Sequence, residues 1–472
     1  MSSAPQDRRT KIVATIGPAS NEPDRLAALV EAGMDGVRLN FSHGTHADHE
    51  LSARRAREVQ KDAGRPLALI ADLQGPKIRI GYLEKPTDLQ PGDKIVVAGE
   101  SLCGVDDLPV APDVLGSVLE AGDEILIDDG HVRLRVERME NAKALCEVVT
   151  GGVVEPHKGV NVPGVPLPVA SLTVKDLSDL EFALGLGVDY VAQSFVRSHT
   201  DVAALKEKIE EAGSQAWVIA KIELKEAVDQ LEAILDTTDA VMIARGDLGV
   251  EIGAAEVPLL QKRIILGALD RGKPAITATQ MLETMIHRPE PTRAEASDVA
   301  NAILDGTSAL MLSAETAVGE YPVEAVATMA RIACAVEPSL GYRHQLPSAL
   351  EDPTVGRAMS NAACDLAEAL GAKAILVPTF TGRTASAVAR LRPRRPVVAL
   401  THVAASLQHM AIEWGVTSLE IPEVTDVEEL WQLSIAAARD AGIVAPGDRV
   451  VLTAGTAVNI PGSTNVIKVD VA

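Results

Sequence analysis

The chain has 472 residues, of which 47% are hydrophobic and 23% are charged, and its formal net charge is -22. A chain of this length and composition can bury large cores, and it should divide into two to four domains. The negative charge argues against binding to nucleic acid or to an anionic membrane, and no apolar run is long enough to cross a bilayer. Four cysteines without Cys-x-x-Cys spacing and a polar N-terminus predict a cytoplasmic protein with reduced thiols. We therefore expect small anionic substrates.

Eight short aliphatic or β-branched runs predict strands, and each is followed by a helical pattern or an insertion. They are Lys11–Gly17, Gly36–Ser42, Leu67–Leu73, Tyr190–Val196, Trp217–Glu223, Ala240–Arg245, Ala275–Thr279 and Ala309–Ser313. Eight strand-helix units are typical of a closed (β/α)₈ barrel, and residues 1–75 with 171–345 have its usual size of about 250 residues. Helices are expected at Asp24–Gly33, His49–Gly64 and Pro291–Leu304, and in the last of these Thr292 stands three residues before Glu295, the spacing of a capping box.

Two further units complete the expected α/β architecture. Residues 76–170 alternate period-two runs with turn dipeptides, which predicts a small all-β barrel. Because this insertion leaves from the C-terminal end of a barrel strand, we interpret it as a lid, although a passive decoration is the alternative. Residues 346–472 predict an open α/β domain, with helices at Val355–Leu370 and Thr384–Leu391 and strands at Ala374–Val377, Val397–Leu400 and Arg449–Thr453.

Two pairs of charged residues mark the ends of neighbouring barrel strands. Lys221 and Glu223 are two residues apart, and so are Arg245 and Asp247. If both pairs lie on strands, each pair shares one face, and a lysine converges with two carboxylates. Two carboxylates suit Mg²⁺, and an ammonium neutralises a phosphoryl group in transfer. The pattern favours phosphoryl transfer over buried ion pairs at a barrel rim.

Further polar residues follow the second and third strands. Arg38, Asn40 and Ser42 share one expected strand face, and the third strand ends at Asp72. Polar side chains on an inner face are costly unless they are paired or functional. The chain lacks both the Gly-x-x-x-x-Gly-Lys-Ser/Thr loop and the Gly-x-Gly-x-x-Gly fingerprint, so a nucleotide must be bound in another way. Three histidines, His43, His46 and His49, have a spacing that resembles a zinc ladder, but we interpret them as ordinary polar residues.

Seven motifs resemble the pyruvate kinase family in order and spacing, and the resemblance runs from residue 10 to the C-terminus. They are TKIVATIGP at Thr10–Pro18, RLNFSHG at Arg38–Gly44, ADLQGPKIR at Ala71–Arg79, AKIE at Ala220–Glu223, ARGDLGVE at Ala244–Glu251, ATQMLE at Ala278–Glu283 and PTRAEASDVAN at Pro291–Asn301. The family has a barrel, an inserted lid and a C-terminal α/β domain, as expected from the patterns above.

The resemblance implies that the phosphoryl group of phosphoenolpyruvate is transferred to ADP, which gives ATP and pyruvate. Glu223 and Asp247 would hold Mg²⁺ or Mn²⁺, Lys221 would stabilise the moving phosphoryl group, and Arg38 would bind the substrate phosphate. The other implied substrate contacts are the backbone N–H groups of Gly246 and Asp247, the Thr279 hydroxyl, Ser194 and Phe195. The implied nucleotide contacts are Arg79, His43, Lys175 and Asn40. A water chain that includes Thr279 would protonate the enolate.

One departure from the family pattern concerns potassium. Many members require K⁺ and carry Thr-Lys-Gly-Pro-Glu, where this chain has Leu-Gln-Gly-Pro-Lys, ending at Lys77. We expect the Lys77 ammonium to replace the charge of K⁺, so that K⁺ is not required. Asn40, Ser42 and Asp72 would then hold Lys77 or Arg38 in place of the ion. The alternative is a solvated loop lysine.

A second site is expected in the C-terminal domain. The segment from Thr379 to Thr384 follows a strand and opens a helix, which is typical of an anion-binding turn but also of a simple helix cap. It resembles the effector phosphate loop of the family, with Thr379, Thr381, Gly382, Arg383 and Thr384 as the implied contacts. Because the segment Gly455–Ser463 lacks an arginine for a second phosphate, we expect a monophosphorylated sugar or nucleotide as activator.

Two other function classes fit parts of the pattern. A metal-dependent carbon–carbon lyase also uses a glutamate, an aspartate and an arginine around Mg²⁺, but it has no use for Lys221 or for so large a lid. A non-catalytic metabolite sensor should have lost an active-site charge, and none is lost here. The resemblance also suggests a homotetramer.

Overall fold

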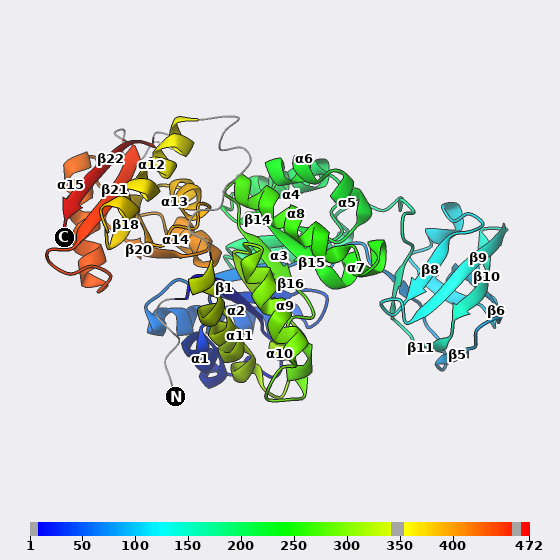
Figure 1. Cartoon of the computed structure of the whole chain (residues 1–472). Coiled ribbons are helices and arrows are strands. Elements are labelled where there is room, and N and C mark those ends of the chain that lie inside the picture. Colours follow the sequence, from blue (N-terminus) through cyan, green and yellow to red (C-terminus); the bar gives the residue numbers. More distant parts are fainter. Residues whose placement is uncertain (1–7, 341–353, 456–463) are drawn as a thin grey trace.

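The computed structural model describes residues 8–340, 354–455 and 464–472. Figure 1 shows three bodies: a central barrel surrounded by helices, a small β-barrel that projects from one end, and a C-terminal sheet with its helices at the other end. None of the described helices is both long and apolar enough to span a membrane.

The central body is a closed barrel of eight parallel strands, which confirms the predicted fold class. In barrel order β2 pairs with β1, followed by β17, β16, β15, β14, β13 and β3, which pairs again with β2. Their bounds are β1 (Lys11–Thr15), β2 (Gly36–Asn40), β3 (Ala68–Asp72), β13 (Tyr190–Gln193), β14 (Trp217–Ile222), β15 (Ala240–Ala244), β16 (Ala275–Ala278) and β17 (Ala309–Leu312). All eight predicted strands are present, and each ends one or more residues earlier than expected.

Helices cover the outside of this barrel and bury its largest hydrophobic core against it. Their bounds are α1 (Pro23–Ala32), α2 (His46–Ala63), α3 (Val174–Gly185), α4 (His199–Glu211), α5 (Lys225–Asp229), α6 (Leu231–Thr237), α7 (Arg245–Ile252), α8 (Val257–Asp270), α9 (Arg293–Leu304), α10 (Ala314–Ala317) and α11 (Pro322–Val336). The expected capping box at Thr292 and Glu295 is present. The prediction placed the start of α2 at His49, which was wrong, because Thr45 caps the helix one turn earlier.

The inserted segment forms a second closed barrel of seven short strands with its own core. These strands are β4 (Ile78–Ile80), β6 (Lys94–Gly99), β7 (Leu108–Ala111), β8 (Glu124–Ile127), β9 (Val132–Glu140), β10 (Lys143–Thr150) and β12 (Gly159–Asn161). The pair β5 (Thr87–Leu89) and β11 (Gly152–Val154) forms a small separate sheet. We call this body the lid. Two segments of chain connect it to the central barrel, one between β3 and β4 and one between β12 and α3, and we call them the two chain crossings.

The C-terminal body is a five-stranded sheet in the order β20-β19-β18-β21-β22, with only β22 antiparallel. Its strands are β18 (Ala374–Pro378), β19 (Val397–Thr401), β20 (Val416–Glu420), β21 (Arg449–Gly455) and β22 (Thr464–Val471). Its helices are α12 (Val355–Ala369), α13 (Arg383–Ala389), α14 (Ala404–His409) and α15 (Val427–Asp440). The sequence analysis predicted three of these strands and two of the helices.

The C-terminal body closes the bottom of the central barrel. The short turn Met410–Ile412 inserts Ile412, which is fully buried, into the apolar cluster formed by the inner strand residues. The Tyr190 hydroxyl donates a hydrogen bond to the carbonyl of His409, whose ring stacks on Trp217 at 4.2 Å. With this end filled, the open end of the barrel lies at the C-terminal ends of its strands, where the lid is attached.

Candidate active site

Lys221 is the centre of a buried charge cluster at the open end of the barrel. β14 carries the lysine near its last residue, and the Lys221 Nζ lies 2.6 Å from Ser194 Oγ, 2.9 Å from Glu223 Oε1 and 3.2 Å from Asp72 Oδ1. Burial alone would lower the pKa of this amine, but Asp72 and Glu223 outweigh it and raise the Lys221 pKa above its ordinary value. The ammonium therefore stays charged, and the Lys221 side chain as a whole is 11% exposed.

Asp72 connects Lys221 to Arg38. The carboxylate is 1% exposed and accepts a hydrogen bond of 2.7 Å from Arg38 Nε, while Arg38 Nη1 donates to Thr15 Oγ1 at 3.0 Å. Burial opposes ionisation of Asp72, yet Lys221 and Arg38 together lower the pKa of this carboxyl. Charges of opposite sign therefore alternate from Arg38 through Asp72 to Lys221 and Glu223, and each compensates the next.

Glu223 is held from two sides. Besides the contact with Lys221, its Oε2 accepts a 2.7 Å hydrogen bond from the Phe195 backbone N–H. Burial raises the pKa of Glu223, Lys221 lowers it, and the nearby charge of Asp247 raises it again. Phe195 has φ of 55°, a conformation that non-glycine residues rarely adopt. Strain of this kind is concentrated at functional sites.

The structure corrects the expected pairing of Arg245 and Asp247. β15 ends at Ala244 and helix α7 begins at Arg245, so the two residues do not share a strand face. The Arg245 guanidinium contacts Asp298, at 2.8 Å from its Oδ1, and donates to the Thr279 carbonyl at 2.9 Å. Arg245 thus holds the backbone around Thr279, whereas Asp247 occupies the first turn of α7.

Thr279 lies directly beside the start of α7. Its Oγ1 accepts a 2.9 Å hydrogen bond from the Gly246 N–H. Thr279 and Gln280 have φ of 65° and 54°, which makes this the second strained backbone segment of the site. Neither strained segment could be predicted from the sequence, and neither could the contact of Asp298 with Arg245.

Lys77 enters the site from the first chain crossing between barrel and lid. Its Nζ lies 3.4 Å from Asp247 Oδ1, and the two side chains are 23% and 25% exposed. Of the groups expected to surround it, Asn40 accepts from the Ser42 N–H at 3.2 Å, and Asp72 is paired with Arg38 and Lys221. Between the two alternatives that the sequence left open, Arg38 is therefore the residue bound by Asp72.

A wide cleft, open to solvent, lies under the lid. Its volume is about 780 Å³, and it separates Arg133 and Asp129 of the lid from α7 and Thr279. The expected nucleotide contacts Arg79, His43, Lys175 and Asn40 are not among the residues that line it. Arg79 donates to the His157 carbonyl at 3.0 Å, and Lys175 contacts the Phe41 carbonyl at 2.7 Å and Asp179 at 2.5 Å. Partial burial lowers the pKa of His43, and the positive charges of Arg79, Arg38 and Lys77 lower it further. The immediate surroundings of His43 are thus electropositive, which suits an anionic ligand.

The donor set fits a hard divalent cation. Glu223 and Asp247 are close enough for the charge of one to raise the pKa of the other, and Mg²⁺ usually takes one or two carboxylates together with substrate oxygens and water. The three histidines do not converge, since His46 Nε2 contacts Asp179 at 2.8 Å and His49 Nε2 contacts the His43 carbonyl at 3.0 Å. Within the described ranges, no group of three or more His, Cys, Asp or Glu side chains forms a metal site.

The expected effector loop lies between β18 and α13. The Gly382 N–H donates to Thr379 Oγ1 at 3.0 Å, and Gly382 has φ of 83°. The Thr384 and Thr464 hydroxyls are 3.0 Å apart, which joins the loop to β22. Of the segment Gly455–Ser463, residues 456–463 lie outside the described residues.

A (β/α)₈ barrel with a buried lysine, two carboxylates and an arginine beneath a lid defines a phosphotransferase site. The sequence comparisons agree: residues 7–326 match the family model described as pyruvate kinase, barrel domain, and residues 357–470 match pyruvate kinase, alpha/beta domain. The chain is 45% identical over its whole length to pyruvate kinase 2 of Synechocystis, and 80% of that relative is covered. It is 44% identical over 98% of its length to the pyruvate kinases of Geobacillus stearothermophilus and Mycobacterium tuberculosis, of which 80% and 98% are covered. The chain belongs to the pyruvate kinase family.

Proposed function

We propose that this pyruvate kinase acts in the cytoplasm and uses Lys221, Glu223 and Asp247 to transfer the phosphoryl group of phosphoenolpyruvate to ADP with Mg²⁺ or Mn²⁺. In this reaction the P–O bond of phosphoenolpyruvate breaks, a P–O bond to ADP forms, and the enolate left behind takes a proton. The observation that carries the proposal is the buried Lys221 ammonium, which two carboxylates keep charged at the mouth of the barrel. A fixed positive charge stabilises a phosphoryl group in transfer without reorganisation.

The substrate contacts follow from the groups around this lysine. Arg38, which Asp72 orients, would bind the transferring phosphate, and Ser194 and Phe195 would contact the substrate; in support, Ser194 contacts Lys221 and Phe195 contacts Glu223. The N–H groups of Gly246 and Asp247 at the start of α7 and the Thr279 hydroxyl would bind the substrate carboxylate. Glu223 and Asp247 would hold the metal, which supplies further positive charge to the phosphoryl group.

On the nucleotide side we propose Arg79, His43, Lys175 and Asn40. In support, the positive charges of Arg79, Arg38 and Lys77 lie near His43. Arg79 is suited to the phosphates of ADP, since a guanidinium forms paired hydrogen bonds with phosphate oxygens. The proton for the enolate carbon would arrive through a water chain beside Thr279, whose own hydroxyl is too weak an acid.

We further propose that the enzyme does not require K⁺. In support, the Lys77 ammonium is 3.4 Å from Asp247, so a fixed monovalent charge already lies beside a metal-binding carboxylate. The test measures pyruvate formation with Mg²⁺ in buffer free of K⁺ and NH₄⁺, then with K⁺ added. We expect full activity of the wild type in both buffers, and a loss of at least about tenfold in Lys77→Gln that K⁺ partly restores. Lys85→Gln, a change at an exposed lid lysine, is the control. A wild type that is active only with K⁺ would reject the role of Lys77.

The C-terminal loop is proposed as the site of a monophosphorylated activator in a homotetramer. Thr379, Thr381, Gly382, Arg383 and Thr384 would supply hydroxyl, guanidinium and backbone N–H donors to one phosphate. Activation curves with AMP, ribose 5-phosphate and fructose bisphosphate, repeated with Thr384→Ala, test this. Activation by the bisphosphate alone would contradict the proposal.

A further inference from the structure

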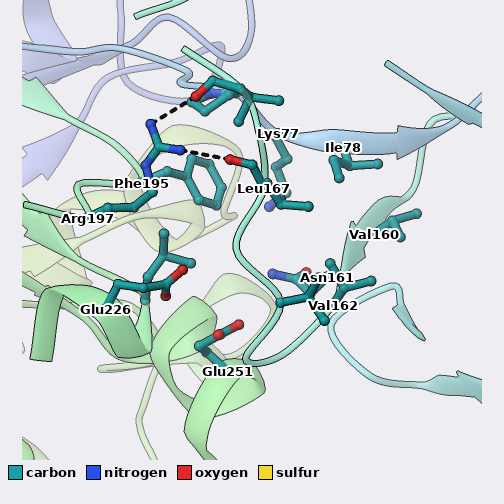
Figure 2. Close-up of a pocket in the computed structure, with 14 residues that line it drawn as sticks. Lys77, Ile78, Val160, Asn161, Val162, Leu167, Phe195, Arg197, Glu226 and Glu251 are labelled. Carbon is teal, nitrogen blue, oxygen red and sulfur yellow. Dashed lines mark hydrogen bonds between the residues drawn. The ribbon is translucent and has the colours of Figure 1, made fainter. Parts of the chain in front are cut away.

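A second pocket lies at the hinge of the lid, beside Phe195. It is narrow and partly open to solvent, and both chain crossings between barrel and lid form its walls. Lys77 and Ile78 come from the first crossing, and residues 160–169 come from the second. Figure 2 shows these segments on one side of the pocket and α5 and α7 of the barrel below it. A ligand in this pocket would therefore contact lid and barrel together.

The walls of the hinge pocket are mainly aliphatic. Ile78, Val160 and Val162 belong to the buried core of the lid, and Val165 and Leu167 pack against that core from the linker. Leu224 and the Phe195 ring complete the apolar surface from the barrel side. Such walls bind the hydrocarbon part of a ligand, because its burial removes apolar surface from water.

The two carboxylates of the pocket form no salt bridge within the described residues, although the charge of Lys225, which is paired with Asp229, acts on both. Glu226 and Glu251 lie on the same side, across from Ile78 and Val160, as Figure 2 shows. Among the residues that the structure describes, the buried Glu226 Oε2 has no hydrogen-bond partner, whereas Glu251 Oε1 accepts the Gly164 N–H at 3.0 Å. Burial raises the pKa of Glu251, the Gly164 N–H lowers it, and the charge of Glu226 raises it again. A buried acceptor without a donor is costly, and a cationic donor would satisfy it.

Two cationic side chains line the pocket, and both contact groups other than its two carboxylates. Arg197 donates from Nη1 to the Leu167 carbonyl at 3.0 Å and from Nη2 to the Val169 carbonyl at 2.9 Å, which are the dashed bonds in Figure 2. The Lys77 ammonium is paired with Asp247 at 3.4 Å in the catalytic cleft. Neither is paired with Glu226 or Glu251 in the described structure, so the space beside these carboxylates is open to an external cation.

We propose that the hinge pocket binds a small organic cation, an ammonium or guanidinium group on a slim apolar chain, and that the bound cation restrains the lid. The charged group contacts Glu226 and Glu251, and the chain lies along Val160, Val162 and Phe195. Because both hinge segments are walls of the pocket, movement of the lid changes its shape, and a ligand that fits this shape opposes the movement. The Phe195 ring packs closely against Gly75, which has φ of 70°: a Cβ on Gly75 would lie only 2.8 Å from the ring. The ring therefore has little room to move toward Gly75.

Binding is tested by calorimetry on the full-length protein with pentylamine at pH 7 and constant ionic strength. We expect saturable binding with a dissociation constant in the millimolar range, as a ligand of this size allows, and at least about tenfold weaker binding of 1-pentanol and pentanoate. Glu226→Gln should weaken pentylamine binding by about tenfold, and Val165→Phe should abolish it by filling the space. Glu210→Gln, a change of the same kind at an exposed helix position, should leave binding unchanged.

The restraint on the lid is tested by hydrogen exchange of residues 160–169, which pentylamine should slow in the wild type but not in Glu226→Gln. A further readout rests on the proposed function: pentylamine should lower kcat in the wild type and not in Glu226→Gln. The binding and exchange measurements do not depend on enzyme activity. Equal binding of pentylamine and pentanol, undiminished binding by Glu226→Gln, or no saturable binding up to about 50 mM would overturn the site. Binding with unchanged exchange in residues 160–169 would overturn the restraint.

Discussion

Asp72→Asn tests whether Asp72 is the shared counter-ion of Arg38 and Lys221. The substitution keeps the shape of the side chain and removes its charge, while the two cations remain buried at 2.7 Å and 3.2 Å from its oxygens. Removal of one partner from a buried ion pair typically costs about 3 to 5 kcal/mol. We expect the lower end, about 3 kcal/mol, because asparagine still accepts one hydrogen bond from Arg38 and Glu223 still faces Lys221. This corresponds to a change of more than about 100-fold in the folding equilibrium.

The assay is urea unfolding at pH 7, followed by the fluorescence of the tryptophans, one of which, Trp217, lies in β14. Asp229→Asn is the matched control, because Asp229 is 59% exposed in its pair with Lys225, and exposed pairs contribute about 0 to 1 kcal/mol. Since the folded-state pKa of Asp72 lies below the ordinary value of 3.8, the difference between wild type and Asp72→Asn should be full above that pH and shrink below it. A variant within about 1 kcal/mol of the wild type at pH 7 would refute the reasoning.

Three further predictions concern groups around this cluster and beyond it. Burial raises the pKa of Glu413 from 4.5 to about 7, against the charge of Arg392. The folded state therefore favours the protonated acid. As the pH rises from 4.5 to about 7, the unfolding free energy of the wild type should fall by about 1.4 kcal/mol per pH unit relative to that of Glu413→Gln. A difference between the two proteins that does not change with pH would contradict this. Asp298→Asn removes the negative charge beside Arg245, which holds the backbone carbonyl of Thr279, and kcat in steady-state assays should therefore fall about tenfold. An unchanged kcat would show that Arg245 does not need Asp298 to be positioned. Thr45→Ala removes the cap of α2 and should lower the unfolding free energy by about 1 kcal/mol in the same urea assay, and no change would mean that the cap is dispensable.

Much of the barrel could be predicted because strand and helix periodicities are local properties of the sequence. The eight apolar runs and the capping box at Thr292 needed only neighbouring residues. The C-terminal sheet was harder to predict: β20, with the sequence VTSLE, is short and lies against a single neighbouring strand, β19. β22 does alternate, with the sequence TNVIKVDV, so this strand is predictable from its pattern.

The site shows where reasoning from spacing fails. Lys221 and Glu223 do meet, because β14 runs to Ile222 and keeps the expected alternation. Arg245 and Asp247 do not, because the chain turns into α7 at Arg245. The contact of Lys77 with Asp247 depends on where the lid lies, and the positive φ values of Phe195 and Thr279 depend on tertiary packing. Neither property is encoded in a local pattern.

The central claim is that Lys221 stabilises the phosphoryl group as it passes between phosphoenolpyruvate and ADP. The most direct test is a rapid-quench measurement of a single turnover with phosphate-labelled phosphoenolpyruvate, comparing the wild type with Lys221→Met and with Lys225→Met, a control at a lysine that is 57% exposed. Loss of one preorganised charge should slow transfer by at least about 100- to 1,000-fold in Lys221→Met, with Mn²⁺ binding retained and Lys225→Met unchanged. Transfer by Lys221→Met at more than about a tenth of the wild-type rate would contradict the account.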